Sequence, residues 1–136
     1  MADRFQIVDA TLKAELAKPY VEGESDCFFL GNQMADALDP TLGLVKLYWR
    51  AYSTLLGAQK ALRKRGHKTL ADLYATHLTP CAPAEAQLGD IVILQLADGQ
   101  HVGICLGMRF VTKTSAGRSD HSIADCVAAF ETGRGA

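Results

Sequence analysis

An excess of either charge is absent from this sequence of 136 residues. Fourteen Lys and Arg residues stand against fifteen Asp and Glu residues, for a formal net charge of −1 at pH 7. Such a chain has no overall field to attract the polyanionic backbone of nucleic acid or an acidic membrane surface. We therefore expect no nucleic-acid partner and no membrane partner. Although residues 60–68 are rich in Lys and Arg, such residues are favoured at a helix C-terminus.

Long apolar runs are missing as well. No run approaches the roughly 20 residues that span a bilayer as a helix. The first residues also lack the basic stretch and apolar stretch of a secretion signal. The sequence therefore predicts synthesis in the cytoplasm without a signal peptide.

Closely spaced cysteines are the third absence. The four cysteines, at positions 27, 81, 105 and 126, form no C-x-x-C pair and no tight cluster with histidine. Zinc sites and dithiol redox motifs both need such spacing. We therefore expect free thiols, no metal and no organic cofactor.

Internal repeats are lacking too, and the chain has two unlike halves. Residues 9–77 have the apolar periodicity of helices, whereas residues 88–130 are strand-like. A Pro-bearing segment separates the two halves. Helices followed by strands predict an α+β fold, and the length predicts a single domain over residues 1–136.

Capping signals divide the first half into four expected helices. Asp9 is placed to cap the first, the second begins at Cys27, and Thr69 caps a short fourth helix. The third is expected over residues 44–65, with Gly57 as a point where it divides. Apolar spacing in the second helix places the Cys27 thiol on its buried side.

The second half predicts an antiparallel sheet. DIVILQLA, residues 90–97, is expected as a buried strand, and Asp98-Gly99 as a hairpin turn. Strands are also expected at 100–107, 109–114 and 122–130. Alternation puts His101 and Gly103 on one face of the returning strand, where a residue without a side chain leaves room beside the imidazole.

Cys27 has two interpretations. On the first turn of a helix, the macrodipole favours a thiolate and lowers the thiol pKa below about 8.5, while free backbone N–H groups bind an oxyanion. A histidine from a distant strand then supplies the general base. Alternatively, a free cysteine on an apolar helix face is a small core residue.

Several segments resemble known families. PYVEGESDC at 19–27 and LGDIVILQLADGQHVGICLG at 88–107 resemble the NlpC/P60 papain-like cysteine peptidases, with Pro-Tyr-x-x-Gly, Asp-Cys at a helix start, Gly-Asp and His-Val-Gly-Ile in order. SDCFFLGNQMADAL at 25–38 and the following residues to 66 resemble small phage-encoded proteins of the DUF6950 type. The resemblance implies a papain-like α+β fold, with N-terminal helices and the cysteine helix packed on a C-terminal antiparallel sheet.

The resemblance also implies roles for individual residues. Cys27 is the expected nucleophile and His101 the base. Thr112 stands where the family has a polar residue that orients the histidine. Tyr20 is expected to line the cleft with its hydroxyl. Phe28 replaces the family's serine, so its bulk either blocks the substrate or buries the thiol.

Two further residues, Asp26 and Gly103, complete the expected substrate-binding site.

Three functions remain open from the sequence. The first is a cysteine hydrolase that cleaves an amide bond, with peptidoglycan stem peptide as the substrate implied by the resemblance. The second is a catalytically inactive structural or assembly component of a phage tail with the same fold. The third is acyl transfer to an acceptor other than water. The resemblance thus implies a peptide substrate, phage tail proteins as partners, and a place in the virion.

Overall fold

The computed structural model describes residues 2–134, without the side chains of Leu55 and Leu56. The helices are α1 (Arg4–Ala17), α2 (Cys27–Leu38), α3 (Leu44–Tyr48), α4 (Leu55–Lys64) and α5 (Leu70–Ala75). The strands are β1 (Thr79–Cys81), β2 (Ile91–Leu96), β3 (Gly99–Cys105), β4 (Phe110–Thr114), β5 (Gly117–His121) and β6 (Cys126–Glu131). Two short 3₁₀ helices, η1 (Pro83–Glu85) and η2 (Ile123–Asp125), lie between strands. The α+β prediction is confirmed.

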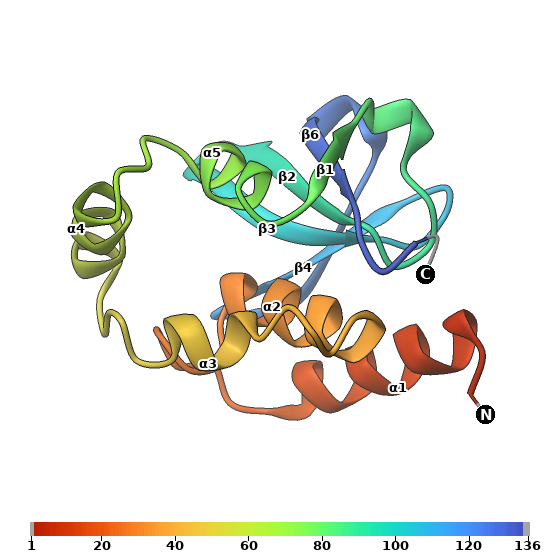
Figure 1. The fold of residues 1–136 in the computed structure, drawn as a ribbon, viewed down its shortest axis with the longest axis horizontal. Coiled ribbons are helices and arrows are strands. Elements are labelled where there is room, and N and C mark those ends of the chain that lie inside the picture. The colour runs from red at the N-terminus through yellow and green to blue at the C-terminus, as the bar shows by residue number, and fades with distance from the viewer. Residues whose placement is uncertain (1, 135–136) are drawn as a thin grey trace.

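The strands form one antiparallel sheet in the order β1-β6-β2-β3-β4-β5. Helix α2 packs on β3 and β4, and α1 covers the outer side of α2 (Figure 1). The expected packing of the cysteine helix on an antiparallel sheet is thus confirmed. No helix in residues 2–134 has the length and apolar character needed to cross a membrane.

The first helix begins earlier than the sequence predicts. Asp3 caps α1 by accepting a hydrogen bond from the Gln6 backbone N–H, and the Gln6 side chain accepts one from the Asp3 N–H. This reciprocal capping box fixes the start at Arg4. Asp9, the predicted cap, instead lies inside the helix and pairs with Lys13 at 2.9 Å.

The predicted helix over 44–65 is wrong in one respect, because it is two helices. The break falls at residues 49–54, not at Gly57. Trp49 ends the helical run with a ψ of 122°, and Arg50 follows it with a positive φ of 56°. Thr54 then starts α4 by accepting a hydrogen bond from the Gly57 N–H at 2.9 Å. Because of this break, α4 stands away from α3 (Figure 1).

All four strands predicted in the second half are present, but the last begins at Cys126 rather than at residue 122, because η2 occupies residues 123–125. Two edge strands were missed. Strands β2 and β3 pair from Ile91↔Ile104 to Leu96↔Gly99. The turn residues are therefore Ala97 and Asp98, and the turn predicted at Asp98-Gly99 is wrong by one residue. The missed strands, β1 and β5, lie at the two edges of the sheet. Strand β1 has only three residues, one of them Pro, and β5 is polar throughout. Neither carries the apolar run that identifies a buried strand.

Both faces of the sheet are buried. Val102 and Ile104 belong to the main core, which also contains Phe29 and Met34 of α2. The opposite face holds a smaller apolar cluster. Gly31 permits the close contact of α2 with the sheet, since a Cβ there would lie 2.6 Å from a Val102 methyl. This packing holds the first turn of α2 against the middle of the sheet.

Candidate functional site

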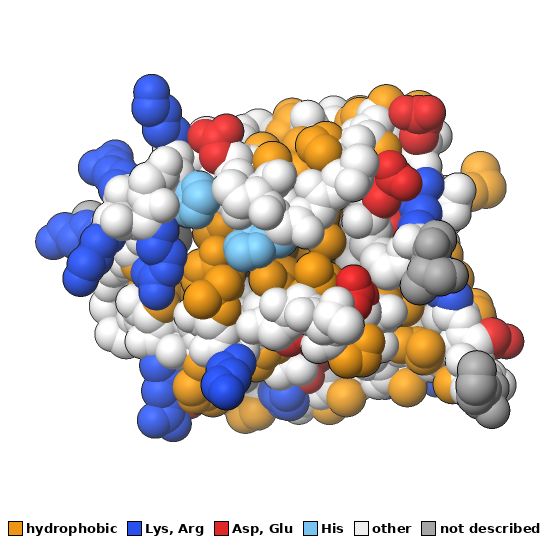
Figure 2. Space-filling view, viewed as in Figure 1, with side chains coloured by type: hydrophobic (Ala, Val, Ile, Leu, Met, Phe, Trp, Pro, Cys, Tyr) orange, Lys and Arg blue, Asp and Glu red, His pale blue; other side chains and the backbone are white. Residues whose placement is uncertain are grey.

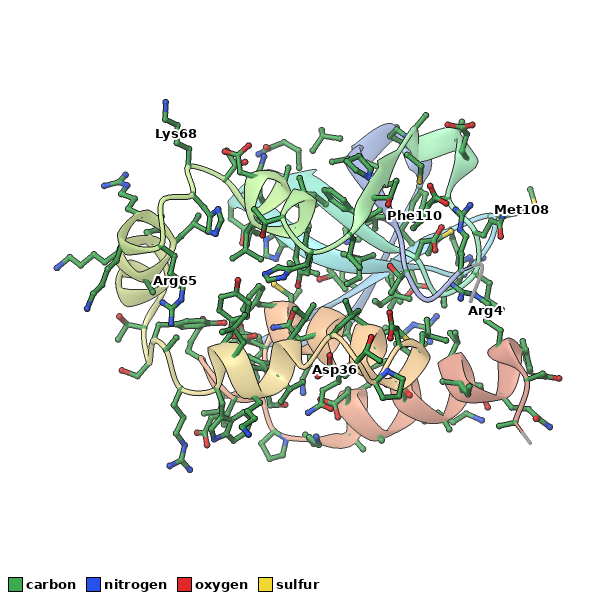
Figure 3. All side chains as sticks on the ribbon, in the orientation of Figure 1. Arg4, Asp36, Arg65, Lys68, Met108 and Phe110 are labelled. Atoms are coloured by element: carbon green, nitrogen blue, oxygen red, sulfur yellow. The ribbon has the colours of Figure 1, made fainter. Side chains whose placement is uncertain are left out.

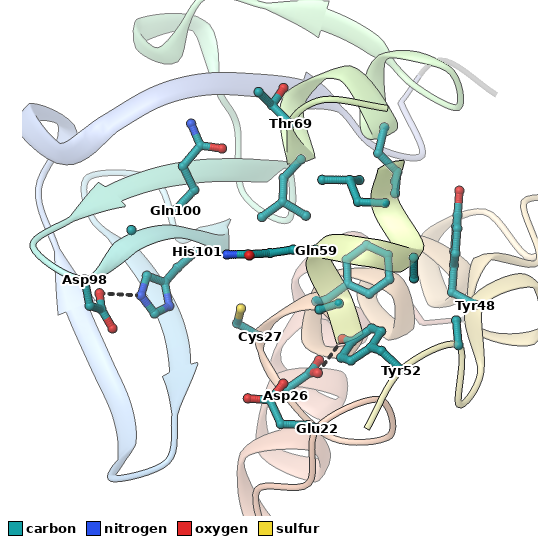
Figure 4. A pocket seen from close by; sticks show the side chains of 18 of the residues that line it. Glu22, Asp26, Cys27, Tyr48, Tyr52, Gln59, Thr69, Asp98, Gln100 and His101 are labelled. Atoms are coloured by element: carbon teal, nitrogen blue, oxygen red, sulfur yellow. Dashed lines mark hydrogen bonds and ion pairs between the residues drawn. The ribbon is translucent and has the colours of Figure 1, made fainter. Parts of the chain in front are cut away.

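A cavity of about 490 Å³ opens between the start of α2, helix α4 and the β2–β3 hairpin. Cys27 and His101 both line it, although 73 residues separate them in the sequence. Figure 4 shows the Cys27 sulfur pointing into this space between His101 and Gln59. The fold therefore brings together the two residues expected to form the reactive pair.

The Cys27 thiol is half-buried at the start of α2, the helix that packs on β3 and β4. It lines the cavity together with His101, which lies on β3.

The thiol pKa is raised to about 12. Burial is the main cause, and the carboxylates of Asp26 and Glu22 add to it. The backbone hydrogen bonds from Val102 and Phe28 act in the opposite direction but do not compensate. The prediction of a pKa below 8.5 is therefore wrong, because desolvation and two nearby acids outweigh the helix dipole.

Asp26 explains why α2 begins at Cys27. One carboxylate oxygen accepts from the Phe29 N–H at 2.9 Å, and the other accepts from the Gly23 N–H at 2.9 Å and from the Tyr52 hydroxyl. Asp26 is fully buried and lines the cavity. Because these three donors occupy its oxygens, its main role is to cap the helix and hold the cavity wall, rather than to bind a substrate.

The partner of His101 is Asp98, which lies on the turn of the hairpin. His101 Nε2 lies 2.7 Å from Asp98 Oδ1, and this hydrogen bond lowers the pKa of the Asp98 carboxyl. A carboxylate only accepts, so Nε2 carries the proton and Nδ1 is free to accept. Figure 4 shows the second ring nitrogen on the side facing Cys27. The sequence does hold a signal for this pair, since an acid stands three residues before the histidine, but that acid by itself predicts only a turn.

Thr112 does not orient the imidazole in this structure. It pairs in register with Gly103, two residues beyond His101, and its buried hydroxyl donates to the Val102 carbonyl at 2.6 Å. The side chain that bonds the imidazole is Asp98 instead. Thr112 thus braces the strand that carries His101, without contacting the ring through a hydrogen bond.

Tyr20 and Gly103 differ in their relation to the cavity. Tyr20 lines it and donates a hydrogen bond to Glu22 at 3.1 Å, and burial raises the pKa of its hydroxyl. Gly103 is buried in the sheet, where a Cβ would lie 2.9 Å from the Val111 carbonyl oxygen and 3.1 Å from Leu94. Its missing side chain is therefore required by packing against β4, and it leaves no room beside the imidazole.

Phe28 belongs to an aromatic cluster. Its ring packs edge-on against Tyr48, with centroids 5.2 Å apart, and against Phe29 at 5.5 Å. It is 7% exposed and lines the cavity. The ring therefore forms part of the apolar wall next to Cys27 and does not fill the cavity.

Sequence reasoning missed Glu22 and Gln59 as cavity residues. Glu22 comes from the loop before α2, and burial raises the pKa of its carboxyl. Gln59 comes from α4 and extends toward the space above Cys27 in Figure 4. Glu22 occupies an open position of the segment at 19–27, so its pattern assigns it no role, and Gln59 meets Cys27 only in the folded chain.

Taken together, fold and site define an α+β protein in which one helix-start thiol and one imidazole share a cavity. A family model described as Domain of unknown function (DUF6950) matches residues 2–132. The chain therefore belongs to the DUF6950 family. A comparison with curated proteins gives no match.

Proposed function

We propose that this protein is a cysteine hydrolase that cleaves an amide bond, with Cys27 as nucleophile and His101 as general base. The observation that carries the proposal is the convergence of the two side chains on one cavity. A thiol and an imidazole in a shared concave site suit nucleophilic attack on a carbonyl.

The raised pKa of Cys27 determines how the nucleophile forms. With a pKa of about 12, roughly one thiol in 10⁵ is ionised at pH 7. The thiol proton must therefore pass to His101 Nδ1 as the sulfur attacks the carbonyl carbon. Asp98 holds Nε2–H and stabilises the imidazolium that results. His101 then acts as a general base, so no preformed thiolate is needed.

The remaining steps use the same groups. The Cys27 backbone N–H, at the start of α2, is the proposed donor to the tetrahedral oxyanion. The imidazolium returns its proton to the leaving amine as the C–N bond breaks and a thioester forms on Cys27. Water, deprotonated by His101, then attacks the thioester. The C–S bond breaks, the imidazolium gives its proton to the Cys27 sulfur, and the acid is released. Acyl transfer would follow the same course with an acceptor other than water.

The proposed substrate is the stem peptide of peptidoglycan, and the proposed setting is a phage or prophage tail. Both rest on the resemblance of residues 19–27 and 88–107 to NlpC/P60 peptidases with a papain-like fold, and of residues 25–66 to phage-encoded proteins. The cavity supports a peptide by its size, since ligand sites have volumes of roughly 300–1,000 Å³. Tail proteins are then the proposed partners.

Incubation with purified peptidoglycan fragments, followed by mass spectrometry of the products, tests this function. The parent protein is expected to release a cleaved peptide, and Cys27→Ala and His101→Ala to release none. Cys126→Ser, which changes a half-buried thiol outside the cavity walls, serves as the control and is expected to retain activity. Cleavage that persists in Cys27→Ala would refute the proposed nucleophile.

A structural role in a phage tail is the second candidate. The observation that favours it is the protonated, half-buried thiol beside the packed Phe28 ring. In that case the parent protein and Cys27→Ala would behave alike in assembly and on every peptide fragment. Absence of cleavage, together with incorporation of both proteins into tails, would support this role over the hydrolase.

A further inference from the structure

A cluster of cations surrounds the α4 side of the cavity. Residues 60–68 contain five of the fourteen Lys and Arg residues of the chain and no acid. The remainder of the chain therefore has nine Lys and Arg against fifteen Asp and Glu. Figure 2 shows these cations gathered at the α4 end of the molecule. Most point outward, as Lys68 does in Figure 3.

Arg65 is the member of this cluster that turns inward. Its guanidinium carbon lies 5.4 Å from the centroid of the Tyr48 ring, and Nη1 lies 3.5 Å from the Ala61 carbonyl oxygen. Figure 3 shows its side chain directed from the end of α4 toward α3. Tyr48 is itself held by a 2.8 Å hydrogen bond to His77. The guanidinium is therefore positioned before any ligand arrives.

Arg65 lines the cavity without a carboxylate of its own. None of the ion pairs among residues 2–134 includes Arg65. By contrast, Arg50, which precedes α4, pairs with Glu24 at 3.0 Å. An arginine offers a planar fork of donors that suits a carboxylate. Its open donors face the space that Cys27 also faces.

The cavity thus has opposite charges on opposite walls. Glu22 and Asp26 lie on the wall that carries Cys27, and Arg65 lies on the α4 wall. Apolar side chains, including Leu62 and Leu73, line the space as well. A ligand that bridges the two walls needs an anionic group at the α4 side.

We propose that Arg65 is an anion-binding subsite of the Cys27 cavity, so that its ligand carries a carboxylate away from the group that meets the thiol. This role of Arg65 rests on the proposed hydrolase function, whose substrates would be peptides with a free carboxylate remote from the scissile bond. Anion binding itself requires no catalysis and can be measured separately.

The test uses two thiol reagents that differ only in charge. 6-Maleimidohexanoic acid and its N-methylamide are reacted with the full-length protein at pH 8, and peptide mapping gives the rate of modification at Cys27. The parent protein is expected to favour the acid by about threefold to fivefold, which corresponds to the upper part of the range for an exposed ion pair. Arg65→Gln is expected to abolish this preference, and 0.5 M salt to reduce it.

Lys64→Gln is the matched control, because it removes an exposed cation of the same segment that does not line the cavity. It is expected to keep the preference. Equal rates for the two reagents in the parent protein would overturn the subsite, and so would an equal loss in Lys64→Gln, which would indicate a general surface field. Unchanged melting temperatures exclude unfolding as a cause.

The rate ratio also separates this inference from the proposed function. His101→Ala is expected to keep the preference for the acid while losing any hydrolysis. A preference without peptide cleavage would refute the hydrolase and retain the subsite. Peptide cleavage without a preference for the acid would support the hydrolase and refute the subsite.

Discussion

His101 Nε2 and Asp98 Oδ1 lie 2.7 Å apart across the turn of the β2–β3 hairpin. The histidine side chain is 17% exposed, whereas that of Asp98 is 75% exposed. Their bond fixes which ring nitrogen carries the proton in the neutral imidazole, and so leaves Nδ1 as the base. Asp98, three residues before His101 in the same hairpin, thus determines which nitrogen of the imidazole can act as a base in the cavity.

Asp98→Ala is expected to remove this tautomer preference. The ¹⁵N spectrum of His101 should show the Nε2-protonated form in the parent protein and a mixture of tautomers in the variant. Thr112→Val is the control, since its hydroxyl bonds the Val102 carbonyl. A tautomer shift in Thr112→Val, with none in Asp98→Ala, would show that Thr112 and not Asp98 orients the imidazole.

The Cys27 thiol should ionise at a higher pH than a free cysteine. Iodoacetamide labelling of the native protein is expected to rise only well above about pH 8.5, because burial and the carboxylates of Glu22 and Asp26 disfavour the thiolate. Glu22→Gln removes one of these charges, so it should shift the labelling profile to lower pH. Glu24→Gln, which changes the acid that pairs with Arg50, should leave it in place. Fast labelling near pH 6 in the parent protein would contradict this prediction.

Acid should destabilise the protein through His77. Burial, and then the charge of His67, lower the pKa of His77 below 6.5. As pH falls through 6.5 the unfolded chain binds a proton at this site before the folded chain does, so the free energy of unfolding decreases. The neutral ring also accepts the Tyr48 hydroxyl, which an imidazolium cannot do. Urea unfolding between pH 7.5 and 5 should show a smaller loss in His77→Gln than in the parent protein, and an equal loss would refute the assignment.

Gly31→Ala should destabilise the fold, although alanine normally favours a helix by about 1 kcal/mol. The added methyl would lie 2.6 Å from a Val102 methyl and 3.0 Å from the Tyr74 hydroxyl. Overpacking of this kind costs roughly 1–3 kcal/mol. Thermal unfolding should show a melting temperature lower by several degrees. Gly57→Ala, whose methyl meets only Thr54 and Tyr52 at 3.1 Å and 3.6 Å, is expected to change it far less.

Local signals account for the parts of the fold that the sequence predicted. Asp26 and the apolar run after it fix the start of α2, and Thr69 fixes that of α5 by accepting from the Asp72 N–H. The Asp98-Gly99 pair predicts the hairpin between β2 and β3, although its turn residues are Ala97 and Asp98. Strands β1 and β5 were not predicted, because edge strands need no apolar run.

The sequence by itself determined that Cys27 begins a helix and that His101 lies on a strand, because caps, turns and apolar alternation act within a few residues. Only the tertiary structure decided what surrounds them. It brings Asp98 within hydrogen-bond distance of the His101 imidazole. It also sets the buried Asp26 and the half-buried Glu22 near the Cys27 thiol, whose pKa is therefore raised instead of lowered. Desolvation and charge depend on distances between segments far apart in the chain, and no local pattern encodes those distances.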